Sequence, residues 1–204
     1  MAESKTPFEG QTVVISGGSK GLGLALAEEF GRQGGHVVIF ARNQDEVMQA
    51  AECLRWRGIS AEAHACDVSD KEGVASMLRE VESSHYGIDV LVNNAGVIHV
   101  GPAESMTAED FEQALDIMLW GMVHATLAVL PGMKARRHGR VVNITSIGGK
   151  VSFPHVLPYA TAKFAAVGFS EGLHSELSGT GVKVITVVPG FIRTASFLNA
   201  DFYG

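Results

Sequence analysis

The segment YATAK places a tyrosine and a lysine one helical turn apart, at Tyr159 and Lys163. Residues i and i+4 lie on the same face of a helix, so the phenol and the ammonium group can reach one point. A phenol beside a cation is suited to proton transfer. The alternative for such a pair is a half-buried tyrosine with its lysine at the surface. The spacing leaves both interpretations open, and the surrounding elements must decide between them.

A glycine-rich segment, SGGSKGLG at 16–23, directly follows the first predicted strand. Gly17, Gly21 and Gly23 carry no side chain at the point where a strand turns into a helix. A pyrophosphate can therefore approach free N–H groups and the positive end of the helix dipole. The pattern is GxxxGxG, and its position between strand and helix favours phosphate binding over a purely structural turn.

The end of the second predicted strand indicates which dinucleotide binds. NAD-binding proteins built on a doubly wound α/β sheet carry an acidic residue about twenty positions after the glycine loop, where it binds the ribose 2′-hydroxyl. Here the strand ends in FARN, with Ala41 in place of the acid, Arg42 beside it and Lys20 in the glycine loop. Two cations suit a 2′-phosphate, so we expect NADP(H) rather than NAD(H). The alternative is that Arg42 only caps the strand.

These residues need an alternation of strands and helices to position them. Short runs of apolar residues predict strands at 12–16, 36–40, 61–65, 89–93, 140–145 and 182–188. Helical patterns lie near 22–33, 45–57, 70–85, 108–136 and 158–178. The alternation predicts an α/β fold, with a single Rossmann-type, doubly wound parallel sheet of about six strands and helices on both faces. Ligands of such sheets bind beyond the carboxyl ends of the strands.

Length and composition indicate one compact domain. The chain has 204 residues, of which 46% are hydrophobic and 19% charged, so we expect residues 1–204 to form a single dinucleotide-binding domain. The formal net charge of −6 argues against a nucleic-acid partner, and the basic segment 134–140 fits a solvated helix end.

Cysteine and histidine usage predicts neither disulfides nor a metal site. The two cysteines, Cys53 and Cys66, form no CxxC motif, and the eight histidines show no HExxH-like pair. The N-terminal segment lacks the apolar core of a signal peptide, and no apolar run approaches the ~20 residues of a membrane span. We therefore expect a cytoplasmic protein with no transmembrane segment.

The chain resembles the classical short-chain dehydrogenase/reductase (SDR) family, of bacterial type, from about residue 10 to its end. Four features carry the resemblance in the family's order: the glycine loop, NNAG at 93–96, the set Ser146, Tyr159 and Lys163, and PGFIRT at 189–194. The interval from Ser146 to Tyr159, 159 − 146 = 13, also matches the family. The resemblance implies an oxidoreductase that reversibly transfers a hydride between NADP(H) and a carbonyl or secondary alcohol of a small molecule.

The resemblance also implies catalytic roles for Ser146, Tyr159 and Lys163. Tyr159 would give a proton to the carbonyl oxygen during reduction and take it back in the reverse direction. Lys163 would lower the pKa of the phenol, normally near ~10, and hold the nicotinamide ribose. Ser146 would bind the substrate oxygen and stabilise its developing negative charge.

The same likeness assigns the cofactor contacts. Asp67 and Val68 would touch adenine, Asn94 would also tether the fourth strand, and a tight turn is the alternative role for NNAG. Asn143 is expected to be structural. The predicted cofactor-binding residues are Gly17, Ser19, Lys20, Gly21, Leu22, Gly23, Arg42, Asp67, Val68, Asn94, Ala95, Gly96, Tyr159, Lys163, Pro189, Gly190, Ile192 and Thr194.

Two features depart from the family pattern. Members usually carry an asparagine in the helix before the fifth strand, where it holds a water that connects the catalytic lysine to solvent. Met118 stands there in this chain, and a thioether is a poor hydrogen-bonding group, so we expect a changed or rerouted proton relay. The family's C-terminal substrate lid and seventh strand are also absent from the sequence, which is expected to leave a strand edge exposed.

The residues expected around the substrate are mainly apolar, which predicts a hydrophobic ketone, aldehyde or alcohol; Lys150 and Arg193 are the exceptions. The apolar set is Val97, Val100, Val151, Phe153, Val156, Leu157, Phe191, Phe197 and Phe202. By likeness we expect a homodimer or homotetramer, with 158–178 as a contact surface. Two alternatives remain, a non-catalytic NADP(H)-binding sensor or scaffold, and a 3-oxoacyl-acyl-carrier-protein reductase.

Overall fold

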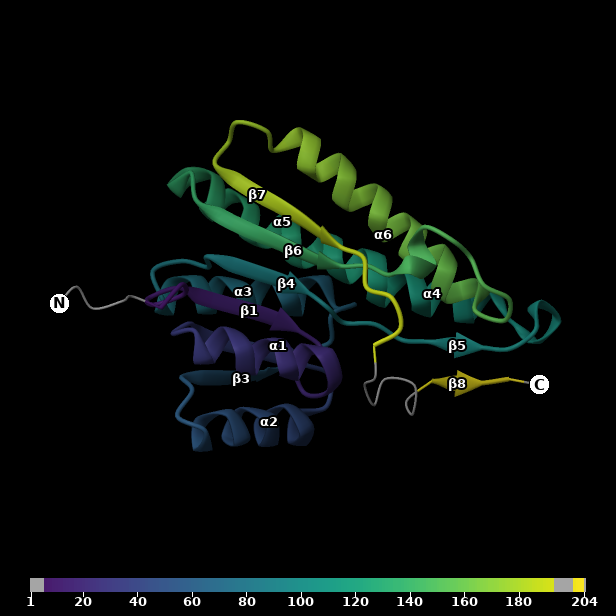
Figure 1. Cartoon of the computed structure of the whole chain (residues 1–204), viewed down its shortest axis with the longest axis horizontal. Coiled ribbons are helices and arrows are strands. Elements are labelled where there is room, and N and C mark those ends of the chain that lie inside the picture. Colours follow the sequence, from purple (N-terminus) through teal and green to yellow (C-terminus); the bar gives the residue numbers. More distant parts are fainter. Residues whose placement is uncertain (1–5, 193–199, 204) are drawn as a thin grey trace.

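The computed structural model describes residues 6–192 and 200–203. A six-stranded sheet with the order β3-β2-β1-β4-β6-β7 forms its centre, and every neighbouring pair is parallel (Figure 1). The strands are β1 (Thr12–Ser16), β2 (His36–Ala41), β3 (Ala61–Ala65), β4 (Val90–Asn93), β6 (Gly139–Ile144) and β7 (Val182–Val187). A separate two-stranded sheet pairs β5 (His99–Val100) with β8 (Asp201–Phe202).

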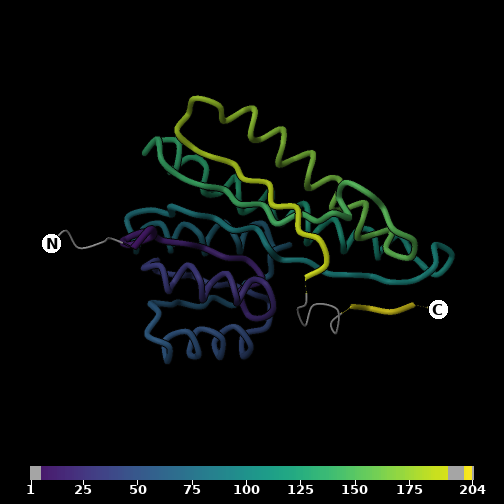
Figure 2. The backbone as a smooth tube through the Cα atoms, in the orientation of Figure 1, coloured from purple at the N-terminus to yellow at the C-terminus, as the bar shows by residue number. Residues whose placement is uncertain are grey.

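Helices cover both faces of the six-stranded sheet. One face carries α1 (Gly21–Arg32) and α2 (Gln44–Trp56), and the other carries α3 (Lys71–Ser84), α5 (Gly121–Arg136) and α6 (Leu157–Glu176). The backbone tube shows how the chain alternates between strand and helix along its length (Figure 2). The remaining elements are α4 (Ala108–Leu115), the π-helical segment η2 (Asp116–Trp120) and two 3₁₀ turns, η1 (Ala103–Ser105) and η3 (Ile147–Gly149).

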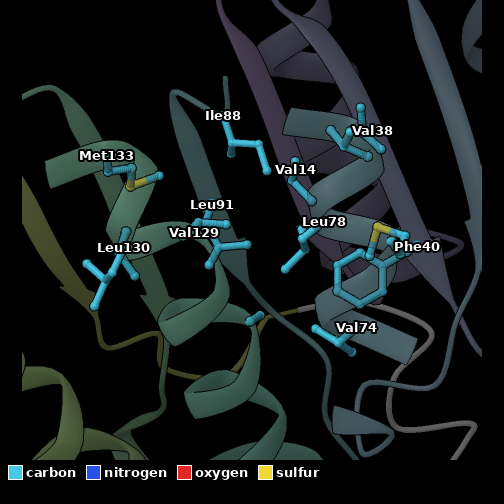
Figure 3. Packing of buried hydrophobic residues seen from close by; sticks show 14 of the residues in the cluster. Val14, Val38, Phe40, Val74, Leu78, Ile88, Leu91, Val129, Leu130 and Met133 are labelled. Carbon is cyan, nitrogen blue, oxygen red and sulfur yellow. The ribbon is translucent and has the colours of Figure 1, made fainter. Parts of the chain in front are cut away.

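The alternation of side chains along each strand divides the core into two layers. Val13 and Ile15 of β1 pack toward α1 and α2, whereas Val14 packs toward α3 and α5. All three are fully buried, and each such side chain contributes about 1.5–3 kcal/mol relative to an exposed one. In the second layer Phe40 and Leu78 interdigitate beneath the sheet (Figure 3).

The order of the strands creates the crevice that a ligand needs. β1 pairs with β2 on one side and with β4 on the other, so the chain reverses its direction of winding at β1. The helices that come after β1 and β4 in the chain, α1 and α5, cover opposite faces of the sheet. Ligands of doubly wound sheets bind at such a switch point, outside the carboxyl ends of the strands.

The predicted single helix over 108–136 is instead three consecutive helical segments, because the π-helical η2 separates α4 from α5. Within Ala108–Arg136 one 18-residue window has a mean hydropathy of 1.5, so by length and composition alone this helical span could cross a membrane, and the expectation that no run approaches this length was wrong. Within the fold, 44% of that window is buried, and Val129 and Met133 of α5 belong to the core beside α3. This packing is that of a core helix.

The predicted strands form with boundaries that differ by at most one residue. AEAHA, the least apolar of them, is the edge strand β3, because pairing with β2 rather than burial holds it. β7 is the opposite edge in the described residues. Its Val182 and Val184 are buried while Lys183 and Ile185 are exposed, so only one face of this strand is covered.

Candidate active site

The carboxyl ends of the strands surround a cavity of about 760 Å³. Its volume lies within the ~300–1,000 Å³ of ordinary ligand pockets. Two predicted residues are not among its lining: Gly23 is buried under the glycine loop, and Thr194 lies outside the described residues. The predicted residues that line it are Gly17, Ser19, Lys20, Gly21, Leu22, Arg42, Asp67, Val68, Asn94, Ala95, Gly96, Ser146, Tyr159, Lys163, Pro189, Gly190 and Ile192.

The glycine loop has the shape of an anion cradle. Gly17 has φ +63°, a left-handed conformation that favours glycine. A Cβ on Gly23 would lie 2.2 Å from the Gly17 carbonyl oxygen and 2.6 Å from Asn94 Nδ2, so no larger residue fits without displacement. α1 begins at Gly21, its N-cap residue Lys20 provides no side-chain cap, and its first turn contains no acid. The N–H groups at this helix start therefore suit a phosphate.

Asn94 and Ser16 fasten the glycine loop to the end of β4. Asn94 Nδ2 donates to the carbonyl oxygens of Ser16 at 3.0 Å and of Gly17 at 3.2 Å. In return, Ser16 Oγ accepts hydrogen bonds from the backbone N–H of Asn94 at 2.9 Å and of Ala95 at 3.1 Å. The tether predicted for Asn94 is present. The part played by Ser16 was not predicted, because a serine at a strand end has no distinguishing spacing.

The region predicted for a 2′-phosphate contains one acid that sequence reasoning missed. Arg42 is exposed at the end of β2 and lines the cavity with Lys20. Lys20 Nζ also lies 3.4 Å from Glu46 Oε2, in the first turn of α2, whose N-cap Asn43 accepts a hydrogen bond from the Glu46 N–H at 3.1 Å. In this part of the cavity rim, Lys20 and Arg42 therefore lie with the carboxylate of Glu46.

Ser146, Tyr159 and Lys163 come together on one wall of the cavity. Ser146 follows β6, and its Oγ accepts a hydrogen bond from the Gly148 N–H at 3.0 Å, while its hydroxyl interacts with Tyr159. Tyr159 and Lys163 lie in the first two turns of α6. Lys163 is 5% exposed, and its Nζ donates to the Ile144 carbonyl oxygen at 2.9 Å.

Burial dominates the titration of the tyrosine and the lysine. It raises the pKa of Tyr159, and a hydrogen bond from Ser146 acts in the opposite direction. Burial also lowers the pKa of Lys163 to about 8. The expectation that Lys163 lowers the pKa of the phenol is therefore not met in this form of the protein. The reason is that Lys163 Nζ points to the Ile144 carbonyl oxygen and lies 5.8 Å from the centroid of the Tyr159 ring.

Met118 forms the apolar backing of this wall. It is 1% exposed within η2 and packs in one cluster with Ala114, Ala162 and Tyr159. Asn143, by contrast, is fully buried beneath the site, where it donates to Ser170 Oγ at 2.9 Å and accepts from Asn93 Nδ2 at 2.8 Å. The structural role expected for Asn143 fits these contacts.

The side of the cavity expected to face the substrate is mainly apolar. Val97, Val100, Phe153, Val156 and Phe191 line it as predicted. Lys150 does not line it and pairs with Glu171 instead. Ile98, Ile117, Ile147 and Pro154 line it without having been predicted, whereas Val151, Leu157 and Phe202 do not line it; Arg193 and Phe197 lie outside the described residues.

Comparison with known proteins gives a family match over most of the chain. The family profile described as short chain dehydrogenase matches residues 11–201. A dehydrogenase/reductase SDR family protein 7-like from Anopheles gambiae is 36% identical over 198 residues, which is 95% of this chain and 62% of that protein. The chain thus spans less than two thirds of that relative's length.

Two solved structures share the fold closely. A metagenomic short-chain oxidoreductase in complex with NADP superposes with a TM-score of 0.85 at 32% identity, over 91% of this chain and 85% of that one. NAD⁺-bound xylitol dehydrogenase superposes with a TM-score of 0.87 at 28% identity, over 91% of this chain and 72% of that one. The chain belongs to the short-chain dehydrogenase family.

Proposed function

We propose that this protein is an oxidoreductase that transfers a hydride reversibly between NADP(H) and the carbonyl or secondary alcohol of a hydrophobic small molecule. The observation that carries the proposal is the shared cavity. The glycine loop at one end and Ser146, Tyr159 and Lys163 at the other line a single cavity of about 760 Å³. The loop that would bind the cofactor phosphates and the tyrosine that would donate the proton therefore face one cavity, in which a dinucleotide and a substrate can bind together.

The residues present fit a dinucleotide. Gly17 and the first turn of α1 leave room and N–H groups for the pyrophosphate, and Asp67 and Val68 line the cavity on the side of β3. Pro189, Gly190 and Ile192 close the opposite side. When bound, the nicotinamide supplies or accepts the hydride.

The side chains of the wall handle the proton and the developing charge. Since Ser146 Oγ already accepts a hydrogen bond from Gly148, its proton can bind a carbonyl oxygen and stabilise negative charge there. Because burial raises the pKa of Tyr159, its phenol stays protonated at neutral pH and is ready to donate to the same oxygen. Lys163 is anchored on the Ile144 carbonyl oxygen, with its Nζ 5.8 Å from the centroid of the Tyr159 ring.

We infer a preference for NADP(H) over NAD(H). Ala41 leaves no carboxylate at the end of β2, and Arg42 and Lys20 line the adjacent rim. Glu46 is bound to Lys20, so it offsets part of this positive charge. Arg42, the exposed guanidinium, remains as the main partner for a 2′-phosphate, because its planar fork matches phosphate oxygens.

Steady-state reduction of a panel of aliphatic, aromatic and steroidal carbonyls tests both parts of the proposal. We expect NADPH oxidation with at least one apolar carbonyl and a higher kcat/KM for NADPH than for NADH. Turnover only with charged keto acids would contradict the apolar substrate, and equal use of both cofactors would contradict the preference.

Met118 favours one alternative, a non-catalytic NADP(H)-binding sensor or scaffold. A buried thioether beside Tyr159 is a weak acceptor and offers little to a proton path from solvent to Lys163. Met118→Asn separates the two proposals. If the protein is an enzyme limited by proton exchange, Met118→Asn should increase its turnover. If neither the wild type nor Met118→Asn turns over and both bind NADPH equally well, the protein is a sensor.

We also propose that the chain assembles as a homodimer or homotetramer through α5 and α6. Leu127 on α5 is 58% exposed and Phe164 on α6 is 46% exposed, and both helices lie on the same face of the sheet (Figure 1). Analytical ultracentrifugation of the wild type and of Phe164→Glu tests this. A monomeric wild type would contradict it.

A further inference from the structure

We propose that His36, Glu62 and His85 form a binding site for a zinc ion, at the end of the sheet opposite to the active-site cavity. His36 is the first residue of β2, Glu62 is the second residue of β3, and His85 follows α3 as its C-cap. One potential ligand atom from each residue lies within 4.8 Å of the other two. This site is independent of the proposed oxidoreductase function.

Parallel strand pairing brings these residues together. Glu62 is the register partner of Val38, and His36 lies two residues before Val38, so the side chains of His36 and Glu62 share a face. α3 covers that face, because Val38 and Val74 belong to one core cluster. The end of α3 therefore places His85 beside His36, and their rings stack with centroids 4.4 Å apart.

The two distances from Glu62 to the histidines are close to those between neighbouring ligands of a metal site, and all three ligand atoms lie within 4.8 Å of one another. Glu62 Oε1 lies 3.3 Å from His36 Nε2 and 3.0 Å from His85 Nε2. Both nitrogens are buried, and neither has a hydrogen-bond partner within the described part of the chain, so the short approaches lack hydrogen-bond geometry. In a tetrahedral zinc site with bonds of about 2.0–2.1 Å, neighbouring ligand atoms lie about 3.3–3.4 Å apart.

The surroundings favour the metal-binding form of the histidine. His36 Nδ1 lies 2.7 Å from Ser60 Oγ, and a hydrogen bond donated by Nδ1 leaves the lone pair of Nε2 directed at Glu62. His64 Nε2 is 3.9 Å from the other Glu62 oxygen and stays outside the ligand set.

Two imidazole nitrogens and one carboxylate oxygen suit Zn²⁺, with water as the fourth ligand. The side chains are 23%, 41% and 21% exposed for His36, Glu62 and His85, so an ion can enter from solvent. The bound ion would connect β2, the edge strand β3 and the end of α3. Because the unfolded chain lacks this arrangement, zinc should stabilise the folded state.

Calorimetric titration of the chelator-treated protein with zinc chloride alone tests the proposal. We expect one Zn²⁺ per chain and a higher Tm with zinc than without. Glu62→Gln and His85→Asn should each weaken zinc binding by at least about tenfold, and Ser60→Ala, which removes only the outer partner of His36, by about tenfold. NADPH affinity should stay unchanged in all three variants, which separates this test from that of the oxidoreductase function.

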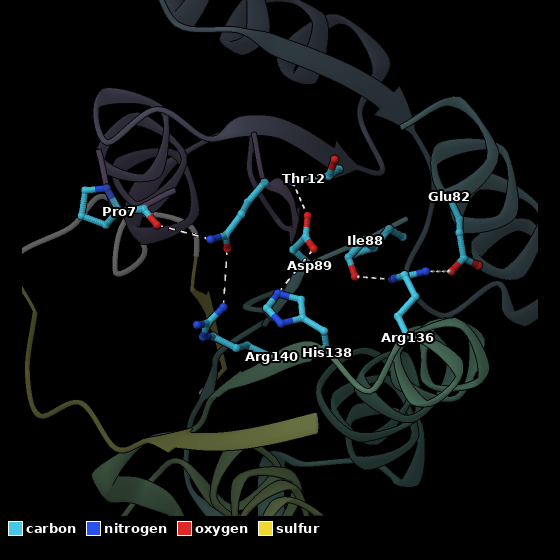
Figure 4. A network of polar contacts seen from close by, with 9 residues as sticks. Pro7, Thr12, Glu82, Ile88, Asp89, Arg136, His138 and Arg140 are labelled. Atoms are coloured by element: carbon cyan, nitrogen blue, oxygen red, sulfur yellow. Dashed lines mark hydrogen bonds and ion pairs between the residues drawn. The ribbon is translucent and has the colours of Figure 1, made fainter. Parts of the chain in front are cut away.

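His138 and Cys53 provide matched controls. His138 Nε2 lies 3.6 Å from Asp89 Oδ1, a histidine–carboxylate pair outside the three-residue cluster (Figure 4). Cys53 is an exposed thiol that could bind zinc by itself. His138→Asn and Cys53→Ser should leave zinc affinity unchanged. The proposal is overturned if the wild type binds no zinc, if Glu62→Gln and His85→Asn retain full affinity, or if His138→Asn loses as much as they do.

Discussion

The two ends of the central sheet use different kinds of chemistry. At the carboxyl end, the cavity is lined by glycine backbone and by Tyr159 and Lys163. Both side chains are largely buried, which raises the pKa of Tyr159 and lowers that of Lys163. At the amino end, the side chains of His36, Glu62 and His85 lie close together and remain partly exposed to solvent. They are therefore less desolvated than Tyr159 and Lys163. We propose that the first end serves the reaction and that the second, with zinc bound, stabilises the fold.

The difference teaches how each kind of site is encoded. A glycine loop and a pair at i and i+4 are local patterns, because one turn of backbone positions all their atoms. The amino-end cluster depends on strand register, which aligns Glu62 with Val38, and on where α3 ends. Perturbing one end while measuring the other therefore tests whether the two are independent.

The largest effect is expected from Tyr159→Phe. Loss of the proton donor should lower kcat by about 10²–10⁴-fold, the range for general acid–base catalysis. NADPH affinity should change far less than kcat, and zinc affinity should not change, because the aromatic ring that packs against Met118 is retained. Steady-state kinetics measure kcat, fluorescence titration measures NADPH affinity, and calorimetric titration measures zinc affinity. A variant with wild-type kcat would show that another group donates the proton.

The second-largest effect is expected from Gly23→Ala, which should destabilise the glycine loop. Its Cβ would lie 2.2 Å from the Gly17 carbonyl oxygen, and overpacking of this kind costs about 1–3 kcal/mol of folding free energy. NADPH affinity should fall as the loop shifts. Gly168→Ala in α6 is the matched control, since nothing lies within 4 Å of its Cβ and helix propensity favours alanine by about 0.5–1 kcal/mol. Equal stability of the two variants in urea would contradict the tight packing.

Arg42→Asp should change the choice of cofactor. A charge-assisted hydrogen bond contributes about 1.5–3 kcal/mol, so we expect NADPH affinity to fall by about 10–100-fold. NADH affinity should stay the same or rise, because a carboxylate can accept hydrogen bonds from a ribose. Titration with both dinucleotides measures the ratio. A parallel fall for NADPH and NADH would mean that Arg42 supports the fold and not selectivity.

Lys163 should make the free energy of unfolding depend on pH in the alkaline range. Burial lowers its pKa from 10.5 to about 8 in the folded protein, so between these values the unfolded chain binds more protons. Stability relative to Lys163→Met should therefore rise with pH across this window, by at most about 1.4 kcal/mol per pH unit. Urea unfolding of the dinucleotide-free proteins at several pH values measures this. A difference that stays constant with pH would contradict the buried ammonium.

Local patterns explain how far sequence reasoning reached. Continuous apolar runs such as TVVIS identified the strands, since a strand buried on both faces needs them. The π-helical η2 was not foreseen, because Asp116–Trp120 continues an ordinary helical pattern. β5 and β8 were also missed, as two-residue strands have no periodicity.

The parts of the sites that escaped prediction depend on tertiary placement. Glu46 reaches Lys20 only because α2 starts beside the glycine loop. His36 and His85 are separated by most of two strand–helix units, and no spacing rule relates them. The pKa of Tyr159 was also misjudged, since burial is a property of the fold and not of the Tyr–Lys spacing.

The most direct test of the central claim is transfer of deuterium from NADPH labelled at the nicotinamide C4 position. The wild-type chain would be incubated with the most reactive apolar carbonyl of the panel, and the product examined by mass spectrometry. The account predicts an alcohol that carries the label on its carbinol carbon, and none with Tyr159→Phe on the same timescale. An NADPH-binding protein that forms no labelled alcohol from any carbonyl would contradict it.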